Sequence, residues 1–135
     1  MIDSVLRIYG EEFDVDAFLS NNSLSIPFES YRKGDDDILG NPNMESGFDA
    51  LLSENESVAD HLAEVKNFLS NHQALFDQVQ SAGAQCIIDL GFTVGGAGQL
   101  TQSIPLPVEL LGICHQLKVA IEVSAYPSSD EQNQS

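Results

Sequence analysis

The residue types that could support metal chemistry are a run of aspartates and three histidines. Asp35, Asp36 and Asp37 are consecutive, whereas a calcium-binding EF-hand loop needs acidic residues at alternate positions, an internal glycine and a terminal glutamate. His61 and His72 would lie about three turns apart on one helix, too far for a shared metal ion. We therefore interpret the aspartate run as a solvated loop or a protein-docking patch, and we predict no metal site.

The residues that could act as nucleophiles or bind phosphate occur in patterns that do not fit those roles. Cys86 and Cys114 lie in apolar surroundings and lack C-x-x-C spacing, which predicts free, buried thiols. Gly95, Gly96 and Gly98 are not followed by the lysine and the serine or threonine of a phosphate loop. We therefore predict no catalytic residue and no cofactor. The sequence does not decide whether the protein is an enzyme, but it favours a non-enzymatic protein.

One polar constellation follows from strand periodicity. Arg7 and Tyr9 in the first predicted strand, Asp89 in the fourth, and Glu122 and Tyr126 in the last all alternate with apolar residues. If these strands are neighbours, the five side chains converge on the side of the sheet opposite the core. An arginine between two carboxylates commonly forms a structural ion-pair network, and such a cluster is also a place where a ligand or a partner could dock.

Regular elements must position these residues. Alternation of apolar and polar residues predicts strands, and a period of 3.6 residues predicts helices. Asp14 is expected to cap a short first helix that ends at Asn21 and Asn22, and Pro105 or Pro107 to open the last. The strands are expected at residues 4–9, 26–32, 46–52, 84–92 and 119–126.

The strongest helical pattern covers residues 57–82, where apolar residues recur every three or four positions. We predict one long helix here, capped by Ser57 and followed by Gly83 as a left-handed residue. His72 falls within the apolar stripe and is expected at the edge of the core. The last helix is expected to turn Leu110, Leu111, Cys114 and Leu117 towards the core.

These elements predict an α+β fold with a mainly antiparallel sheet and helices on one face. A ferredoxin-like arrangement with an added element accommodates this order of strands and helices. The chain has 135 residues, about the size of one domain. We expect residues 1–126 to form a single domain and residues 127–135 to be a disordered acidic and polar tail.

The charge balance restricts the partners of this chain. Lys and Arg total 5 and Asp and Glu total 21, so the net charge is −16, which repels nucleic-acid backbones and anionic membranes. The opening MIDSVLRIYG lacks the basic and apolar regions of a secretory signal, and no segment is long and apolar enough to cross a bilayer. We therefore expect a cytoplasmic protein that binds neither nucleic acid nor membrane.

Four segments together carry a resemblance to a known family: VLRIYG near the start, YRKGD at Tyr31 to Asp35, IIDLGF after the long helix, and VAIEVSAY near the end. With these segments, residues 4–126 resemble the bacterial family described as domain of unknown function 4279. The resemblance implies a small cytoplasmic protein without an assigned activity, and some members are thought to act as immunity proteins that neutralise a toxin. The acidic loop GDDDILGNPN departs from the family pattern.

The function that we expect is a non-enzymatic acidic protein-interaction module. Most of the acidic residues lie in the first half of the chain, and such a field accelerates association with a basic protein. The module would be an immunity-type or regulatory binder, with a basic protein such as a toxin as its partner. The alternatives are an enzyme or small-ligand binder that uses the polar cluster on the open side of the sheet, and a DNA mimic. A homodimer is also left open.

Overall fold

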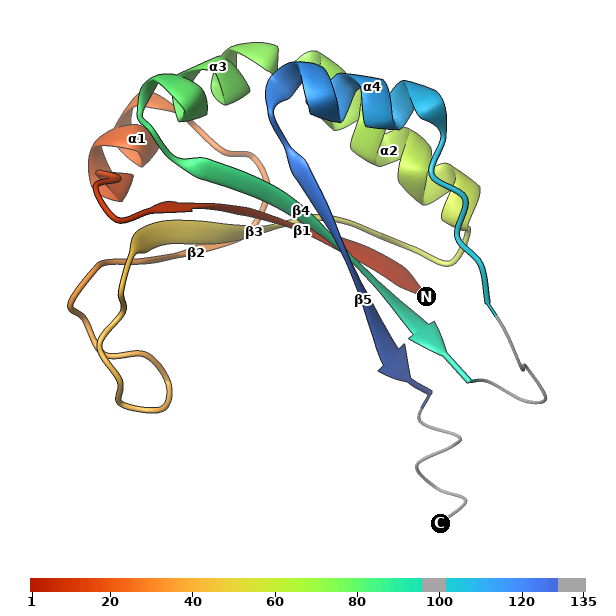
Figure 1. Ribbon diagram of the computed structural model, residues 1–135, viewed down its shortest axis with the longest axis horizontal. Coiled ribbons are helices and arrows are strands. Elements are labelled where there is room, and N and C mark those ends of the chain that lie inside the picture. Colours follow the sequence, from red (N-terminus) through yellow and green to blue (C-terminus); the bar gives the residue numbers. More distant parts are fainter. Residues whose placement is uncertain (96–101, 129–135) are drawn as a thin grey trace.

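A five-stranded sheet runs through the molecule in the order β2-β3-β1-β4-β5 (Figure 1). The computed structural model describes residues 1–95 and 102–128. Neighbouring strands are antiparallel except β4 and β5, which are parallel, so the sheet is mixed and mainly antiparallel. The strands are β1 (Ile2–Gly10), β2 (Phe28–Tyr31), β3 (Ser46–Asn55), β4 (Gln85–Val94) and β5 (Ala120–Pro127).

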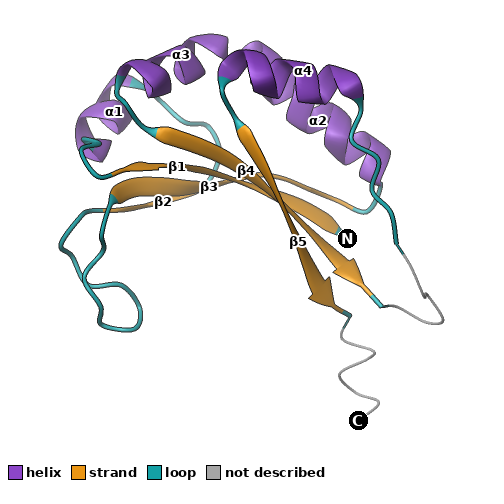
Figure 2. Cartoon of the chain, viewed as in Figure 1, coloured by secondary structure: helices purple, strands orange, loops and turns teal. Residues whose placement is uncertain are grey.

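All four helices of the described residues cover the same face of this sheet (Figure 2). The helices are α1 (Val15–Asn21), α2 (Val58–Asn71), α3 (Gln73–Ser81) and α4 (Val108–Leu117). The order of elements from β1 to β4 is the β-α-β-β-α-β order of a ferredoxin-like fold, with the second helix in two pieces. Helix α4 and strand β5 are the added element, and the crossover through α4 makes β5 parallel to β4. The α+β prediction is thus confirmed.

The core lies between the helices and the covered face of the sheet. Leu6 and Ile8 of β1 and Phe48 of β3 have no exposed surface, and neither do Leu69 of α2 and Phe76 of α3. Strand β1 alternates strictly between buried and half-buried residues, because one of its faces packs on the helices and the other does not.

The predicted long helix at residues 57–82 is wrong in one respect, because it breaks at His72 into α2 and α3. His72 has φ −125° and ψ 32°, outside the helical region. Its imidazole N–H donates to the carbonyl of Phe68 at 2.8 Å, and the two rings stack with centroids 4.1 Å apart. The apolar stripe continues in α3 through Leu75, Phe76 and Val79, so periodicity alone did not reveal the break.

The ends of the elements largely follow the predicted signals. Asp14 caps α1 by accepting from Ala17 N–H at 3.0 Å, Ser57 caps α2, and Gly83 has φ +71°. The prediction that Leu111 faces the core is wrong, because Leu111 is 43% exposed whereas Leu110, Cys114 and Leu117 are buried.

The predicted tail starts slightly too early. Pro127 is the last residue of β5, and Ser128 N–H donates to the Val94 carbonyl at 2.9 Å. The rest of the predicted tail, 129–135, lies outside the described residues, as do Gly96 and Gly98 of the glycine-rich turn. Within the described part of the chain, no helix is long and apolar enough to cross a membrane.

The placement of α2 over the sheet predicts a strong dependence of stability on Leu69. Leu69→Ala removes a side chain with no exposed surface, so the free energy of unfolding should fall by about 2 to 5 kcal/mol through lost burial and a residual cavity. Leu39→Ala is the matched control, because Leu39 is 84% exposed, and its effect should stay within about 0.5 kcal/mol. Denaturant melts measure both, and a loss below about 1 kcal/mol for Leu69→Ala would mean that this face of α2 does not form the core.

Candidate functional site

The face of the sheet opposite the helices, here called the open face, carries the predicted polar constellation. Residues that pair directly across neighbouring strands point to the same face. Arg7 pairs with Asp49 and Ile87, and Asp89 pairs with Val5 and Glu122, so these side chains share the open face. Its other members, by register and alternation, include Asp3, Tyr9, Glu29, Tyr31, Gly47, Leu51, Gly91, Ser124 and Tyr126.

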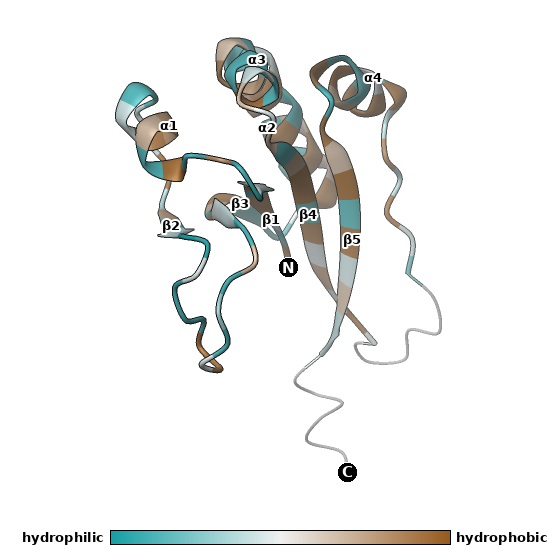
Figure 3. Ribbon diagram, turned by 60° about the vertical axis from the view of Figure 1, so that its left-hand side comes forward, coloured by the Kyte–Doolittle hydropathy of each residue, from teal (hydrophilic) through white to brown (hydrophobic). Residues whose placement is uncertain are grey.

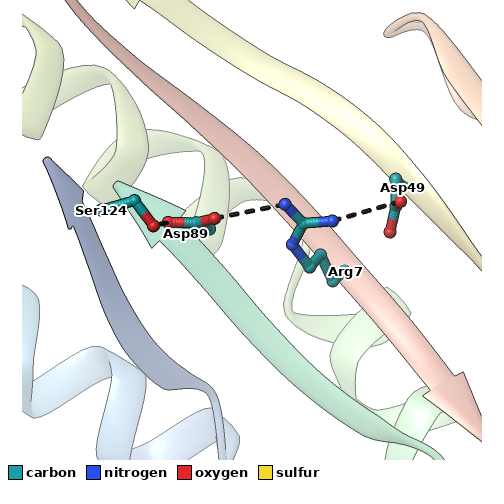
Figure 4. A network of polar contacts seen from close by, with 4 residues as sticks. All are labelled: Arg7, Asp49, Asp89 and Ser124. Atoms are coloured by element: carbon teal, nitrogen blue, oxygen red, sulfur yellow. Dashed lines mark hydrogen bonds and ion pairs between the residues drawn. The ribbon is translucent and has the colours of Figure 1, made fainter. Parts of the chain in front are cut away.

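Arg7 joins three strands at the centre of this face (Figure 4). One terminal nitrogen of its guanidinium donates to Asp49 on β3 at 3.2 Å, and the other donates to Asp89 on β4 at 3.2 Å. The hydroxyl of Ser124 on β5 donates to the second oxygen of Asp89 at 2.8 Å. The network therefore ties β3, β1, β4 and β5 together.

Burial makes the two carboxylates of Arg7 unequal. The Asp89 side chain is 8% exposed, whereas those of Arg7 and Asp49 are each 38% exposed. Burial lowers the pKa of Arg7, but the hydrogen bond to Asp89 and the charges of Asp49, Asp89 and Glu122 outweigh it, so its pKa lies above the ordinary value. Burial raises the pKa of Asp49, and nearby Glu29 raises it further against the opposing effect of Arg7. Asp89 is thus the carboxylate that depends most on Arg7.

A depression of about 450 Å³ lies beside Arg7 on the open face. Two of its walls are Tyr9 and Tyr31, which flank Gly47: a Cβ atom on Gly47 would lie 2.7 Å from the Tyr31 hydroxyl and 2.8 Å from the Tyr9 Cβ. Burial, together with the charges of Asp49 and Glu45, raises the pKa of Tyr31. The lining residues are Arg7, Tyr9, Tyr31, Glu45, Asp49, Ile87 and Glu122. Two phenol rings among carboxylates form an environment suited to a cationic group.

The structure brings together four of the five residues of the predicted constellation. Arg7 and Asp89 are in contact, and Tyr9 and Glu122 line the same depression as Arg7. Tyr126 lies elsewhere on the open face, packed over Gly91, where an added Cβ would come within 3.0 Å of its ring.

The sequence analysis missed several members of this site. Asp49 could have been placed on the open face from the sequence, because it lies between the apolar residues Phe48 and Ala50 of β3. Ser124 was equally detectable, because it alternates with the apolar residues of β5. Tyr31 and Glu45 enter the site through the pairing of β2 with β3 and the loop between these strands, and no local pattern signals that.

The aspartate run lies apart from the Arg7 network, in the loop between β2 and β3. Asp35, Asp36 and Asp37 are exposed, and Figure 1 shows this loop projecting on the open-face side, away from the helices. Asp37 accepts from the backbone N–H groups of Leu39 and Asn41, both at 2.9 Å, so one of the three carboxylates orders the loop. Within the described residues, no group of three or more His, Cys, Asp or Glu side chains is placed to hold a metal ion.

A second polar network is buried under α2. His61 and Ser4 have no exposed surface, so the buried histidine is His61, whereas His72 lies at the core edge. His61 Nδ1 lies 2.8 Å from the amide oxygen of Asn55. Because that oxygen only accepts, Nδ1 carries the proton and Nε2 accepts from the Ser4 hydroxyl. A serine–histidine chain of this kind resembles a catalytic arrangement, but burial of Ser4 keeps substrates away from its hydroxyl.

The cysteines are buried and free, which confirms the prediction for them. Burial raises the pKa of Cys86 to about 12 and that of Cys114 to about 11. Both thiols therefore stay protonated at neutral pH and are poor nucleophiles.

A family model described as Domain of unknown function (DUF4279) matches residues 2–128. No curated protein and no solved structure matches the chain significantly. The geometry of the open face is therefore the basis for any functional assignment.

The unequal burial of the carboxylates yields a prediction for Arg7. Arg7→Met keeps the aliphatic stem but leaves Asp89 without its cation, so the free energy of unfolding should fall by about 1 to 3 kcal/mol. Asp89→Asn in the same chain should recover part of that loss, because an amide needs no countercharge. Arg32→Met is the control: the Arg32–Asp16 pair is exposed, and its loss should leave the melting midpoint unchanged. Equal midpoints for the single and double Arg7 variants would show that Asp89 does not depend on Arg7.

Burial lowers the pKa of His61 below its ordinary value of about 6.5, against the opposing charges of Glu64 and Asp3. The unfolded state therefore takes up a proton first as the pH falls. The stability contribution of neutral His61 is complete above pH ~6.5 and is lost as the pH falls from there towards the folded-state pKa. Denaturant melts between pH 8 and about 5.5 should show this decline. His61→Gln should flatten it and exposed His115→Gln should not; an unchanged slope in His61→Gln would refute the assignment.

Proposed function

We propose that this chain, which belongs to the DUF4279 family over residues 2–128, is a non-enzymatic, acidic protein-interaction module. Its partner would be a basic protein, and its role that of an immunity-type or regulatory binder. The binding surface would be the open face together with the loop that carries Asp35, Asp36 and Asp37.

One observation carries this proposal: the only cation on the strands is already neutralised. Among the described residues, the five strands contain a single Lys or Arg, which is Arg7, and it is held between Asp49 and Asp89. The remaining carboxylates of the open face, including exposed Glu29 and Glu122, have no lysine or arginine other than Arg7 near them among the strand residues. The surface therefore carries net negative charge.

The acidic loop adds further negative charge beside the open face. It projects on the open-face side of the sheet (Figure 1), and Glu45 at its end lines the depression with Tyr9 and Tyr31. Exposed rim charges of this kind accelerate the encounter with an oppositely charged partner more than they slow dissociation. The proposed location is a reducing cytoplasm, which suits the two free thiols, and the immunity role implies a bacterial one.

A small-ligand binder or enzyme is the second candidate, and the depression beside Arg7 favours it. Its tyrosines and carboxylates would select a cationic molecule rather than an anionic one. Native mass spectrometry of freshly purified protein distinguishes the two candidates. A small molecule retained by the wild type and lost in Tyr9→Ala would favour the ligand-binding role, and binding of basic proteins without such a molecule would favour the interaction module.

The acidic surface yields a kinetic prediction for a basic partner recovered from lysate. Neutralising the loop with Asp35→Asn, Asp36→Asn and Asp37→Asn should slow association about fivefold or more at low salt and leave dissociation nearly unchanged. The wild type should lose its advantage as salt rises, because the Debye length falls from ~10 Å at 0.1 M to ~3 Å at 1 M. Surface-capture kinetics measure both rates.

The matched control removes the same number of charges on the helix side of the sheet, through Glu11→Gln, Glu12→Gln and Asp77→Asn, all exposed. This control should slow association less than the loop variant does. Equal association rates for the loop variant and the wild type at low salt would refute the proposed role of the loop.

A further inference from the structure

Among the described residues, strand β5 is an edge of the sheet that lacks several common protections against pairing. In the strand order it has one neighbour, β4, and it runs for 8 residues in unbroken register with that neighbour. Edge strands in soluble proteins are commonly protected by short length, a bulge, a lysine or a proline. In β5 the single proline is the last residue, Pro127, and there is no lysine.

The other edge of the sheet is protected. Strand β2 has only 4 residues, and Pro27 stands directly before it. The two edges therefore differ, and within the described part of the chain β5 is the longer and less protected edge.

The backbone of β5 presents hydrogen-bonding groups outwards. Along a parallel ladder, successive residues direct their N–H and C=O groups alternately to the two sides. Ser128 N–H donates to the Val94 carbonyl of β4, so residues 120, 122, 124 and 126 also point to β4. The N–H groups of Ile121, Val123 and Ala125 consequently point away from the sheet. Pro127, which has no N–H, occupies the next outward position.

The residues along β5 alternate in hydropathy (Figure 3). Glu122, Ser124 and Tyr126 belong to the open face, where Glu122 lies beside Asp89. Ile121 and Val123 belong to the helix side, and Val123 is 51% exposed. A strand added to this edge would thus meet negative charge on one face and apolar surface on the other.

We propose that β5 binds an extended segment of the basic partner as a sixth strand, in which lysine or arginine alternates with apolar residues. The inference rests on the proposed function and specifies how its partner is held. Backbone hydrogen bonds to β5 give affinity, cationic side chains lie beside Glu122, and apolar side chains lie beside Val123.

The charge of the protein argues against a second copy in this position. Each copy carries a net charge of −16, so pairing two β5 strands brings two strongly negative bodies together. The same charge attracts a basic segment. The charge of the whole protein therefore favours a basic segment over a second copy.

The experiment uses the whole protein and an eight-residue, fluorescently labelled peptide that alternates Lys and Val. Three peptides accompany it: the same peptide with alternate backbone nitrogens methylated, a block peptide of the same composition, and a Glu–Val alternating peptide. Fluorescence anisotropy should show at least tenfold tighter binding of the Lys–Val peptide than of all three. Amide hydrogen exchange should slow at residues 121, 123 and 125.

Two variants locate the binding on β5. Val123→Pro removes an outward N–H at an edge position that tolerates proline, and it should weaken binding at least tenfold with little change in melting temperature. If that variant does not fold, the methylated peptide on the wild-type protein carries the same test. Glu122→Gln should weaken binding, whereas Glu29→Gln, the same change on the β2 edge, should not.

The outcomes separate the two proposals. Equal binding of the Lys–Val and block peptides would overturn strand addition and leave the acidic module standing. If the Glu–Val peptide bound as tightly as the Lys–Val peptide and this binding were lost in Val123→Pro, the result would support strand addition. It would overturn the selection of a basic partner. No binding of the Lys–Val peptide would overturn the inference. A dimer that forms without peptide and dissociates in Val123→Pro would also overturn it, in favour of a second copy.

Discussion

The ion pair between Arg7 and Asp89 is the interaction on which the character of the open face depends. Asp89 lies in β4 with its side chain 8% exposed, and a carboxylate at that depth needs a cation or several hydrogen bonds. Arg7 on the adjacent strand and Ser124 on β5 supply them. Because Arg7 also contacts Asp49, the two carboxylates that bind the guanidinium already exceed its single positive charge. Buried Asp89 needs Arg7 as its cation, and the surface around this pair therefore remains acidic.

The one-sided position of the helices explains why this surface is available. All four helices of the described residues pack on the face that carries Leu6, Ile8 and Phe48 (Figure 2), so the tyrosines and most of the charged residues of the opposite face stay in contact with solvent. The added α4–β5 unit extends the sheet beyond β4 and brings Ser124 and Glu122 next to Asp89. It also moves the edge of the sheet from β4 to β5. The polar network, the depression and the unprotected edge therefore arise from the same arrangement of layers.

Local patterns in the sequence predicted the elements and the side on which most of their residues lie. Alternation in β1 and β4 placed Arg7 and Asp89 opposite the core, and the contact then followed from the neighbouring positions of these strands. The sequence did not reveal features set by tertiary contacts. The break at His72 coincides with stacking of its ring on Phe68 and with a hydrogen bond from its imidazole to the Phe68 carbonyl, within an unbroken apolar stripe. The bulge in β3 opposite Ser4 and Val5 shifts the register, and the Ser4–His61 contact joins residues far apart in sequence.

The central claim is that the open face is an acidic surface exposed to solvent. Relaxation of tyrosine ring protons by charged nitroxide cosolutes, measured by NMR, tests it most directly. The account predicts that a cationic nitroxide relaxes Tyr9 and Tyr31 several-fold more than an anionic one at low salt, and that the difference disappears near 1 M salt, where the Debye length is ~3 Å. Phe28, which is 43% exposed and packs against Phe48 on the helix side, should show a smaller difference. Equal relaxation of the two tyrosines by both nitroxides, or protection from both, would contradict the account.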